Sequence, residues 1–349
     1  MQCCLELAEK GISAVAPNPM VGCVIVENGE IIGEGYHERY GEAHAEVNAI
    51  KTVQAKYPEH YRERLKNATL YVNLEPCAHH GKTPPCSDLI IQHEIKKVVI
   101  GCLDSNPLVA GKGIGKLQRA GIEVKSGVHE AACRNLNKRF FTFHEKHRPY
   151  IILKWAQTAD GFISKLPVPA DRNDNLVSGE GAQRLTHLWR SQEQAIMVGT
   201  NTVRADDPLL NVRLIAGRDP VKVILDRKDS LGTPRLVNAE AKTLFFTEDT
   251  HIQKNADRYQ QQEHAERIPI SFDEQLLQSI LTELYKRNFI SLLVEGGARL
   301  LQSFIDENLF DEIRVFTASK KFNEGVKAPS FALKASSELK VGEDTLRIY

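Results

Sequence analysis

Short apolar runs alternate with amphipathic stretches along the chain, which is the pattern of strands alternating with helices. In the first half, apolar runs predict strands over residues 21–26, 30–36, 69–73, 98–101 and 122–125. Amphipathic spacing predicts helices over residues 2–13, 44–52 and 86–93. Asn28-Gly29 lies between the first two runs and is a strong hairpin signal. This alternation predicts an α/β layered domain.

A second alternation begins at Tyr150, after a basic and partly helical connector over residues 134–149. The expected strands are 151–155, 195–198, 221–225, 243–247, 291–294 and 313–318. The expected helices are 181–191, 272–286 and 298–307, and the polar residues 251–267 are expected to be a solvated surface segment. We therefore expect two domains, 1–147 and 148–349, and a length of 349 residues favours the same division.

Composition narrows the class of protein. The 45 basic and 45 acidic residues balance, and this argues against a nucleic-acid-binding protein, which would normally have a basic domain. Seven cysteines in a chain of this length do not form a disulfide scaffold. Neither a signal peptide nor 18 continuous apolar residues are visible, so we expect a cytoplasmic protein that does not bind membranes.

One group of residues has the composition of a metal site. His44-Ala45-Glu46 is followed 30 residues later by Pro76-Cys77 and then by Cys86. One imidazole and two thiolates leave the fourth position of a tetrahedral Zn²⁺ open for water, as in catalytic zinc sites. The H-x-E and P-C signature is typical of zinc-dependent deaminases, in which the glutamate is the acid/base and not a ligand. His44, Cys77 and Cys86 are therefore candidate zinc ligands, and Glu46 is the candidate catalytic residue.

This motif departs from the usual P-C-x-x-C spacing, because eight residues separate Cys77 from Cys86. The insert is polar and cationic and ends in Pro84-Pro85, so we expect a loop that adds contacts to a substrate. A structural zinc site and a chance coincidence of residues remain as alternatives.

Two glycine clusters could be taken for nucleotide-binding loops. Residues 111–115 (Gly-Lys-Gly-Ile-Gly) fail the G-x-G-x-x-G spacing, so we expect a structural loop there. Gly296-Gly297 comes after an apolar run that ends in Glu295, and a predicted helix follows. The N–H groups at such a helix start suit a phosphate, although a simple strand-to-helix turn explains the cluster equally well.

At these residues the chain resembles the bifunctional riboflavin-biosynthesis deaminase/reductases over nearly its whole length. In the first half the matching stretches are 17–22, 35–37, 42–46, 74–86 and 104–107. The long loop between the cysteines separates this family from cytidine and tRNA deaminases, so the unusual spacing supports the resemblance. In the second half the matching stretches are 154–161, 199–213 and 295–297.

For the first half, the resemblance implies a cytidine-deaminase-like three-layer domain that removes an amino group from a diaminopyrimidinone ribosyl phosphate. Glu46 would move the proton of the zinc-activated water to the ring nitrogen and the departing ammonia. The residues implied to bind the pyrimidine and sugar are Asn18, Asp104 and Asn106, and those implied to meet the phosphate are His37, His79 and Lys82.

For the second half, the resemblance implies a dihydrofolate-reductase-like domain that uses NADPH to reduce the ribosyl group to ribityl. The implied substrate-binding residues are Arg190, Leu210, Arg213 and Glu295. The implied cofactor-binding residues are Ala156, Thr202, Asp206, Gly297, Ala298, Arg299, Leu300, Leu301, Gln302 and Ser303. Residues 165–175 differ from the family pattern, so no contacts are assigned to that loop.

The resemblance also implies a homo-oligomer, either a dimer or a tetramer, whose partner is a small-molecule substrate. Three other hypotheses remain. The second domain could have lost reductase activity, leaving a deaminase only. The chain could be an RNA-editing deaminase with an accessory domain, which its zero net charge disfavours. Finally, it could be a non-catalytic interaction protein stabilised by zinc.

Overall fold

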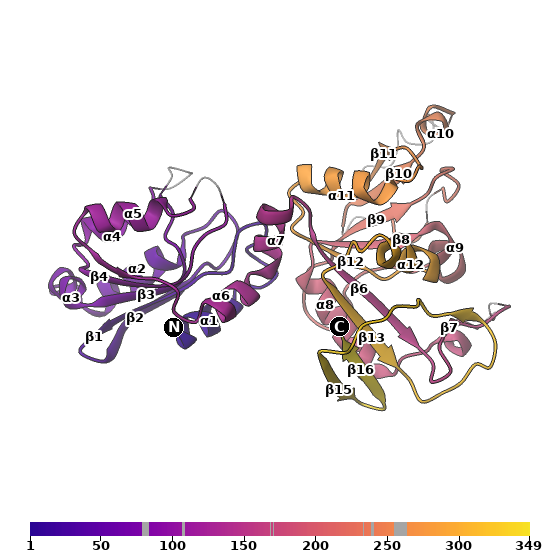
Figure 1. The fold of residues 1–349 in the computed structure, drawn as a ribbon, viewed down its shortest axis with the longest axis horizontal. Helices are drawn as coiled ribbons and strands as arrows, with labels where there is room; N and C mark the ends of the chain where they lie inside the picture. The colour runs from indigo at the N-terminus through magenta and orange to yellow at the C-terminus, as the bar shows by residue number, and fades with distance from the viewer. Residues whose placement is uncertain are drawn as a thin grey trace. The chain divides into compact units, whose positions relative to one another are not determined.

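The computed structural model describes residues 1–78, 84–106, 109–167, 169, 171–232, 234–238, 241–254 and 264–349. Its chain forms two compact units, Met1–His147 and Arg148–Tyr349 (Figure 1). Among the described residues, no helix combines the length and the apolar character that crossing a bilayer requires.

The first unit is built on a five-stranded sheet with the order β2-β1-β3-β4-β5. Its strands are β1 (Gly22–Glu27), β2 (Glu30–Tyr36), β3 (Thr69–Leu74), β4 (Lys97–Cys102) and β5 (Glu123–Lys125). The expected Asn28-Gly29 turn joins β1 to β2, and both residues have the positive φ that this turn requires. β1 runs antiparallel to β2 and β3, whereas β3, β4 and β5 are parallel.

Helices cover both faces of this sheet and complete three layers (Figure 1). They are α1 (Gln2–Glu9), α2 (Ala45–Lys56), α3 (Tyr61–Asn67), α4 (Cys86–Gln92), α5 (Lys112–Arg119), α6 (Glu130–Leu136) and α7 (Lys138–Lys146). The larger apolar core joins α2, α3, α4 and α5 to one face, and Leu5 and Cys133 bring α1 and α6 to the core of the other. The three-layer prediction is confirmed.

The prediction of a loop over residues 111–115 is wrong, because α5 begins at Lys112 and contains Gly113 and Gly115. A Cβ atom on Gly113 would lie 2.1 Å from the backbone oxygen of Pro76, so only glycine lets this helix approach so closely. The buried carboxylate of Glu75 accepts hydrogen bonds from the backbone N–H groups of Gly111, Gly113 and Ile114. These contacts satisfy the otherwise unpaired N–H groups of the helix start.

The second unit contains a nine-stranded sheet with the order β11-β10-β9-β8-β12-β6-β13-β16-β15. The strands are β6 (Tyr150–Gln157), β8 (Ala195–Gly199), β9 (Val221–Leu225), β10 (Thr243–Thr247), β11 (Ala265–Pro269), β12 (Ser291–Val294), β13 (Glu312–Thr317), β15 (Ser337–Val341) and β16 (Asp344–Ile348). The seven strands from β11 to β13 in this order are parallel, and β16 and β15 extend the sheet in antiparallel fashion. A short pair, β7 (Phe162–Ser164) and β14 (Val326–Lys327), lies outside it.

Helices lie on both faces of this second sheet as well. They are α8 (Glu180–Gln192), α9 (Thr200–Asp206), α10 (Asp249–Lys254), α11 (Leu276–Lys286) and α12 (Ala298–Asp306), together with the 3₁₀ helix η1 (Arg172–Asn175). Leu281 of α11 and Phe304 of α12 belong to the largest core, whereas Trp189 of α8 packs on the opposite face, against Phe316. Residues 265–267, expected in a solvated segment, instead form part of β11, and 255–263 lie outside the described residues.

Candidate functional site

Three element ends bring the predicted zinc ligands together in the first unit. His44 immediately precedes α2, and Glu46 lies in the first turn of that helix. The chain leaves β3 at Leu74 and reaches Cys77 three residues later, while Cys86 begins α4. Ligands at helix starts are favourable for a metal site, because the N-terminal end of a helix stabilises thiolate anions.

The distances within this group fit a metal ion. Nδ1 of His44 lies 3.2 Å from Sγ of Cys86 and 3.7 Å from Sγ of Cys77. All three ligand atoms lie within 4.8 Å of one another. In a tetrahedral zinc site, bonds of about 2.3 Å to sulfur and 2.0 Å to nitrogen place such ligand pairs roughly 3.5 Å apart. The donor set is one nitrogen and two sulfurs, which is the chemistry of a zinc site with one open position.

The two thiols of the group differ in protonation, because the hydrogen bond to Cys77 and burial raise the pKa of Cys86, whereas that of Cys77 is lowered. The pKa of Cys77 is lowered to about 4, because the Cys86 side chain donates a hydrogen bond to its sulfur and His44 adds another. Glu46 is only 3% exposed, and its burial raises the pKa of the carboxyl group above the usual range. A carboxyl group with a raised pKa beside an open metal position is suited to exchanging protons.

Asn18 and His37 lie at one side of this group. The Nδ2 atom of Asn18 is 3.1 Å from Nε2 of His37, and Nδ1 of His37 is 3.0 Å from the backbone oxygen of Ala43. The ring of His37 packs edge-on against the ring of His44, with 5.5 Å between centroids. Both nitrogens of His37 thus have protein partners and its side chain is buried, so this conformation suits orienting Asn18 better than meeting a phosphate.

Asp104 and Asn106 follow β4 and are joined by a 2.7 Å hydrogen bond from the Asn106 backbone N–H to Oδ1 of Asp104. The Asp104 backbone N–H donates to the Glu75 carboxylate, at 3.3 Å. Burial raises the pKa of Asp104 to about 6, and the negative charges of Glu75 and Cys77 act in the same direction. The predicted residues His79 and Lys82 lie outside the described residues.

Replacing Asp104 with asparagine tests this raised pKa. The folded state of the wild type binds the Asp104 proton more tightly than the unfolded chain does, so stability is lost as pH rises from about 4 to about 6. The amide of the Asp104→Asn variant would keep the acceptor for Asn106 and would have no charge to bury. We expect the free energy of unfolding of the variant to rise relative to that of the wild type by about 2 kcal/mol between pH 4.5 and 7.5. Urea unfolding of both proteins at each pH measures this difference. A difference that shrinks with pH would instead mean that a cation stabilises the ionised Asp104.

The second unit contains a large cleft at the carboxyl ends of its parallel strands. Its volume is about 1800 Å³, above the roughly 300–1000 Å³ of a pocket for one small molecule. Such strand ends are the usual binding edge of α/β sheets. The predicted residues that line this cleft are Ala156, Arg190, Thr202, Asp206, Leu210, Arg213, Glu295, Gly297, Ala298, Arg299, Leu300, Leu301 and Ser303.

Gln302 is the predicted cofactor residue that does not line this cleft. One turn of α12 cannot present every residue to one side, and the Gln302 amide instead bonds Asp306 and the backbone of Ser330. Its assignment to the cofactor stays a prediction, and in this conformation its amide faces Asp306 and Ser330.

The glycine turn between β12 and α12 forms a cradle in the cleft wall. A Cβ atom on Gly296 would lie 2.5 Å from Cα of Val198, and Gly297 has a φ of +39° and lies against Thr202. Both positions therefore require glycine. The nine-residue helix α12 begins immediately afterwards, and the residues of its first turn line the cleft, where the N–H groups of a helix start suit a phosphate.

A buried ion pair lies beside this turn. Arg190 donates two hydrogen bonds to the Glu295 carboxylate, at 2.9 and 2.7 Å. Burial alone would raise the pKa of Glu295, but the charges of Arg190 and Lys154 prevail and lower it to about 2. Lys154 also lines the cleft, and burial lowers the pKa of its amine. Arg190 is thus committed to holding Glu295, and Lys154 is a functional candidate that the sequence reasoning quoted within a motif but did not select.

Sequence reasoning also missed a group of cations in the cleft wall. Arg204 lies in α9, and the others follow β9 in the chain: Arg227, Lys228 and Arg235. Nη2 of Arg204 donates to Oγ of Ser230 at 2.6 Å, which connects the two segments. These residues can be identified only from their position in the structure, because single lysines and arginines in a sequence form no motif with a characteristic spacing.

Two family models match the chain. The model described as the cytidine and deoxycytidylate deaminase zinc-binding region matches residues 1–102. The model described as the RibD C-terminal domain matches residues 149–334.

Individual relatives are similar in sequence to this chain over nearly its full length. A riboflavin biosynthesis protein RibD from Aquifex aeolicus is 41% identical and covers 97% of this chain and 91% of its own; one from Synechocystis is 42% identical and covers 95% and 86%. The solved structure of a diaminohydroxyphosphoribosylaminopyrimidine deaminase/5-amino-6-(5-phosphoribosylamino)uracil reductase from Thermotoga maritima is similar, with a TM-score of 0.86 at 37% identity, covering 100% of this chain and 96% of its own. The chain belongs to the RibD family of riboflavin biosynthesis proteins, which join a zinc-binding deaminase domain to an NADPH-using reductase domain.

Proposed function

We propose that this chain carries out two consecutive reactions on one small molecule. Residues 1–147 would hydrolyse the 2-amino group from 2,5-diamino-6-(5-phosphoribosylamino)pyrimidin-4(3H)-one. Residues 148–349 would then reduce the ribosyl group of the product to ribityl with NADPH. The observation that carries the proposal is the group of His44, Cys77 and Cys86 beside the buried Glu46.

His44, Cys77 and Cys86 would hold Zn²⁺, which supplies a Lewis acid that makes water a nucleophile at neutral pH. Glu46 would accept a proton from that water on its carboxylate and deliver protons to the ring nitrogen and the leaving ammonia. Its burial supports this assignment, because it keeps bulk water from competing for the proton. The residues proposed to hold the substrate are Asn18, Asp104 and Asn106, with His37 orienting Asn18 and with His79 and Lys82 toward the substrate phosphate.

In the second unit NADPH would supply the hydride, and the protein would bind and orient the two reactants. The glycine turn and α12 are suited to the cofactor pyrophosphate, and Thr202 and Asp206 line the adjoining wall. Lys154, Arg190 and Glu295 would face the substrate. The Arg190–Glu295 ion pair is formed before substrate arrives, so these two charges need no reorganisation during the reaction. We further propose a homo-oligomer, dimeric or tetrameric, located in the cytoplasm.

One incubation tests both reactions. The purified protein is mixed with the diaminopyrimidinone ribosyl phosphate and NADPH, and ammonia and absorbance at 340 nm are followed together. We expect ammonia release followed by NADPH oxidation in equal amounts. Ammonia release without NADPH oxidation would favour a deaminase whose second domain has lost activity. If neither ammonia release nor NADPH oxidation were observed, the proposal would be refuted.

The cations of the cleft predict a preference for NADPH over NADH. The 2′-phosphate of NADPH adds about two negative charges, and each hydrogen bond to a charged group contributes about 1.5–3 kcal/mol. We expect Lys228→Ala to raise the KM for NADPH about tenfold and Arg204→Ala/Lys228→Ala about 100-fold, with the KM for NADH unchanged. Steady-state kinetics with both cofactors measure this. Lys286→Ala, on α11 and away from the cleft lining, is the matched control, and equal losses with both cofactors would contradict the assignment.

A further inference from the structure

Side chains hold the backbone of residues 210–213 at the edge of the reductase cleft. Nη1 of Arg190 donates to the Asn211 backbone oxygen at 3.2 Å, and the Val212 backbone N–H donates to Asp219 at 2.7 Å. Leu210 is buried with a φ of +54°, a strained backbone conformation for leucine. Three successive residues after this strained position are thus fixed by contacts from outside the segment, and the third of these contacts comes from His187.

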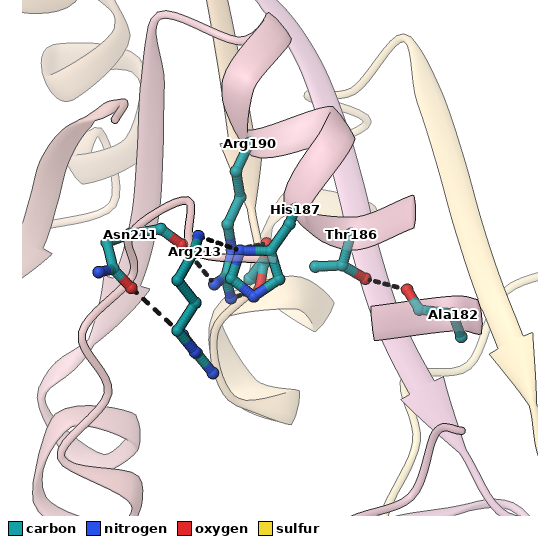
Figure 2. A network of polar contacts seen from close by, with 7 residues as sticks. Ala182, Thr186, His187, Arg190, Asn211 and Arg213 are labelled. Atoms are coloured by element: carbon teal, nitrogen blue, oxygen red, sulfur yellow. Dashed lines mark hydrogen bonds and ion pairs between the residues drawn. The ribbon is translucent and has the colours of Figure 1, made fainter. Parts of the chain in front are cut away.

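The Arg213 backbone N–H donates to Nδ1 of His187 at 3.2 Å (Figure 2). A backbone N–H can only donate, so Nδ1 must accept, and the imidazole is neutral with its proton on Nε2. His187 lies in α8 one turn before Arg190, which places both side chains on the face of the helix toward residues 211–213. The two residues therefore fix the segment at neighbouring points.

His187 does not line the cleft, whereas Leu210 and Arg213 do. The Arg213 guanidinium is exposed and donates to Oδ1 of Asn211 at 3.2 Å, so it stays close to the segment that carries it. Any displacement of the Arg213 backbone would move this cation relative to a bound anion. Replacing the neutral acceptor by a protonated ring would lose the hydrogen bond and add a third positive charge beside Arg190 and Arg213.

We propose that His187 is a positioning residue of the reductase, whose neutral imidazole holds the Arg213 backbone so that the guanidinium meets an anionic group of the substrate. This inference rests on the proposed reduction of a phosphorylated substrate. Burial and the charges of Arg190 and Arg213 lower the pKa of His187 to about 4, and this keeps the acceptor available at neutral pH.

Three substitutions at position 187 separate the acceptor from the bulk of the ring. His187→Phe keeps the ring and removes the acceptor. His187→Asn places an amide oxygen near the position of Nδ1, whereas His187→Gln places it near Nε2. We expect the KM for the deaminated substrate to rise about tenfold in the Phe and Gln variants and to return within about threefold of the wild type in Asn. The KM for NADPH should stay constant, and His264→Phe, an exposed histidine of the same unit, is the control.

A double-mutant cycle with Arg213→Ala tests the link to the guanidinium. If His187 acts through Arg213, adding His187→Phe to Arg213→Ala should raise the KM less than threefold further. A full tenfold increase in that background, or equal KM values for the Asn and Gln variants, would overturn the proposal. If the Phe variant does not fold, the comparison of the substrate KM values of the Asn and Gln variants still tests the proposal. A wild type that does not oxidise NADPH would count against the reductase function itself, not against this inference.

Discussion

Replacing Glu46 with glutamine is expected to reduce the kcat of ammonia release by about 10³- to 10⁴-fold while zinc remains bound. Glutamine has the shape of glutamate but cannot accept a proton, and positioned acid/base groups contribute factors of this size. Glu46 does not belong to the group of candidate zinc ligands, which is His44, Cys77 and Cys86, so the zinc content of the variant should not change. Ammonia release and elemental analysis of the same preparation provide the measurement.

Two controls make the Glu46→Gln result specific. Glu42→Gln removes a carboxylate from an exposed position four residues away and should leave ammonia release intact. NADPH oxidation with substrate that is already deaminated should be unchanged in both variants, because the described residues that line the reductase cleft belong to the second unit. Undiminished ammonia release in Glu46→Gln would remove this residue from the mechanism.

Apolar runs located most strands of both units within one or two residues. β9, β10 and β12 have the predicted bounds, because each is a buried run with a polar residue or turn at its ends. β15 and β16 were missed, and β15 is an exposed edge strand whose alternation carries little apolar signal. α3 was missed for a related reason, since Leu65 is its one fully buried residue and no periodicity results.

The glycines of α5 show what local sequence does not contain. Glycine is a poor helix former, so residues 111–115 predict a loop. Tertiary contacts decide otherwise, because Gly113 fits against the Pro76 carbonyl and the Glu75 carboxylate satisfies the helix start. Both partners are distant from α5 in the sequence, and no periodicity within α5 reports them.

The two candidate sites differ in how far the sequence could predict them. The zinc group was predictable because the ligands are chemically unusual residues at a recognisable spacing. Lys228 and His187 were not, since a cation in a loop and a histidine in an amphipathic helix are common in any protein. They become candidates only when the fold places one in the cleft wall and the other behind Arg213.

Replacing Cys86 with alanine is expected to abolish both zinc binding and ammonia release. Cys86 begins α4, lies 3.2 Å from His44 and donates its backbone N–H to the Cys77 sulfur at 3.3 Å. The variant would leave two protein ligands where a catalytic zinc site has three. Ammonia release should fall further than in Glu46→Gln, below detection, since without the metal no activated water forms for Glu46 to deprotonate.

Cys102→Ala is the matched control for Cys86→Ala, because Cys102 is an equally buried thiol of the same unit that is not in the ligand group. It should retain one zinc per chain and release ammonia, although removal of its packed sulfur lowers stability. In Cys86→Ala, NADPH oxidation with deaminated substrate should persist at the wild-type rate, which would show that the second unit is folded. If Cys86→Ala retained stoichiometric zinc, the metal would have to be held by other residues. The catalytic assignment of the whole group, Glu46 included, would then fail.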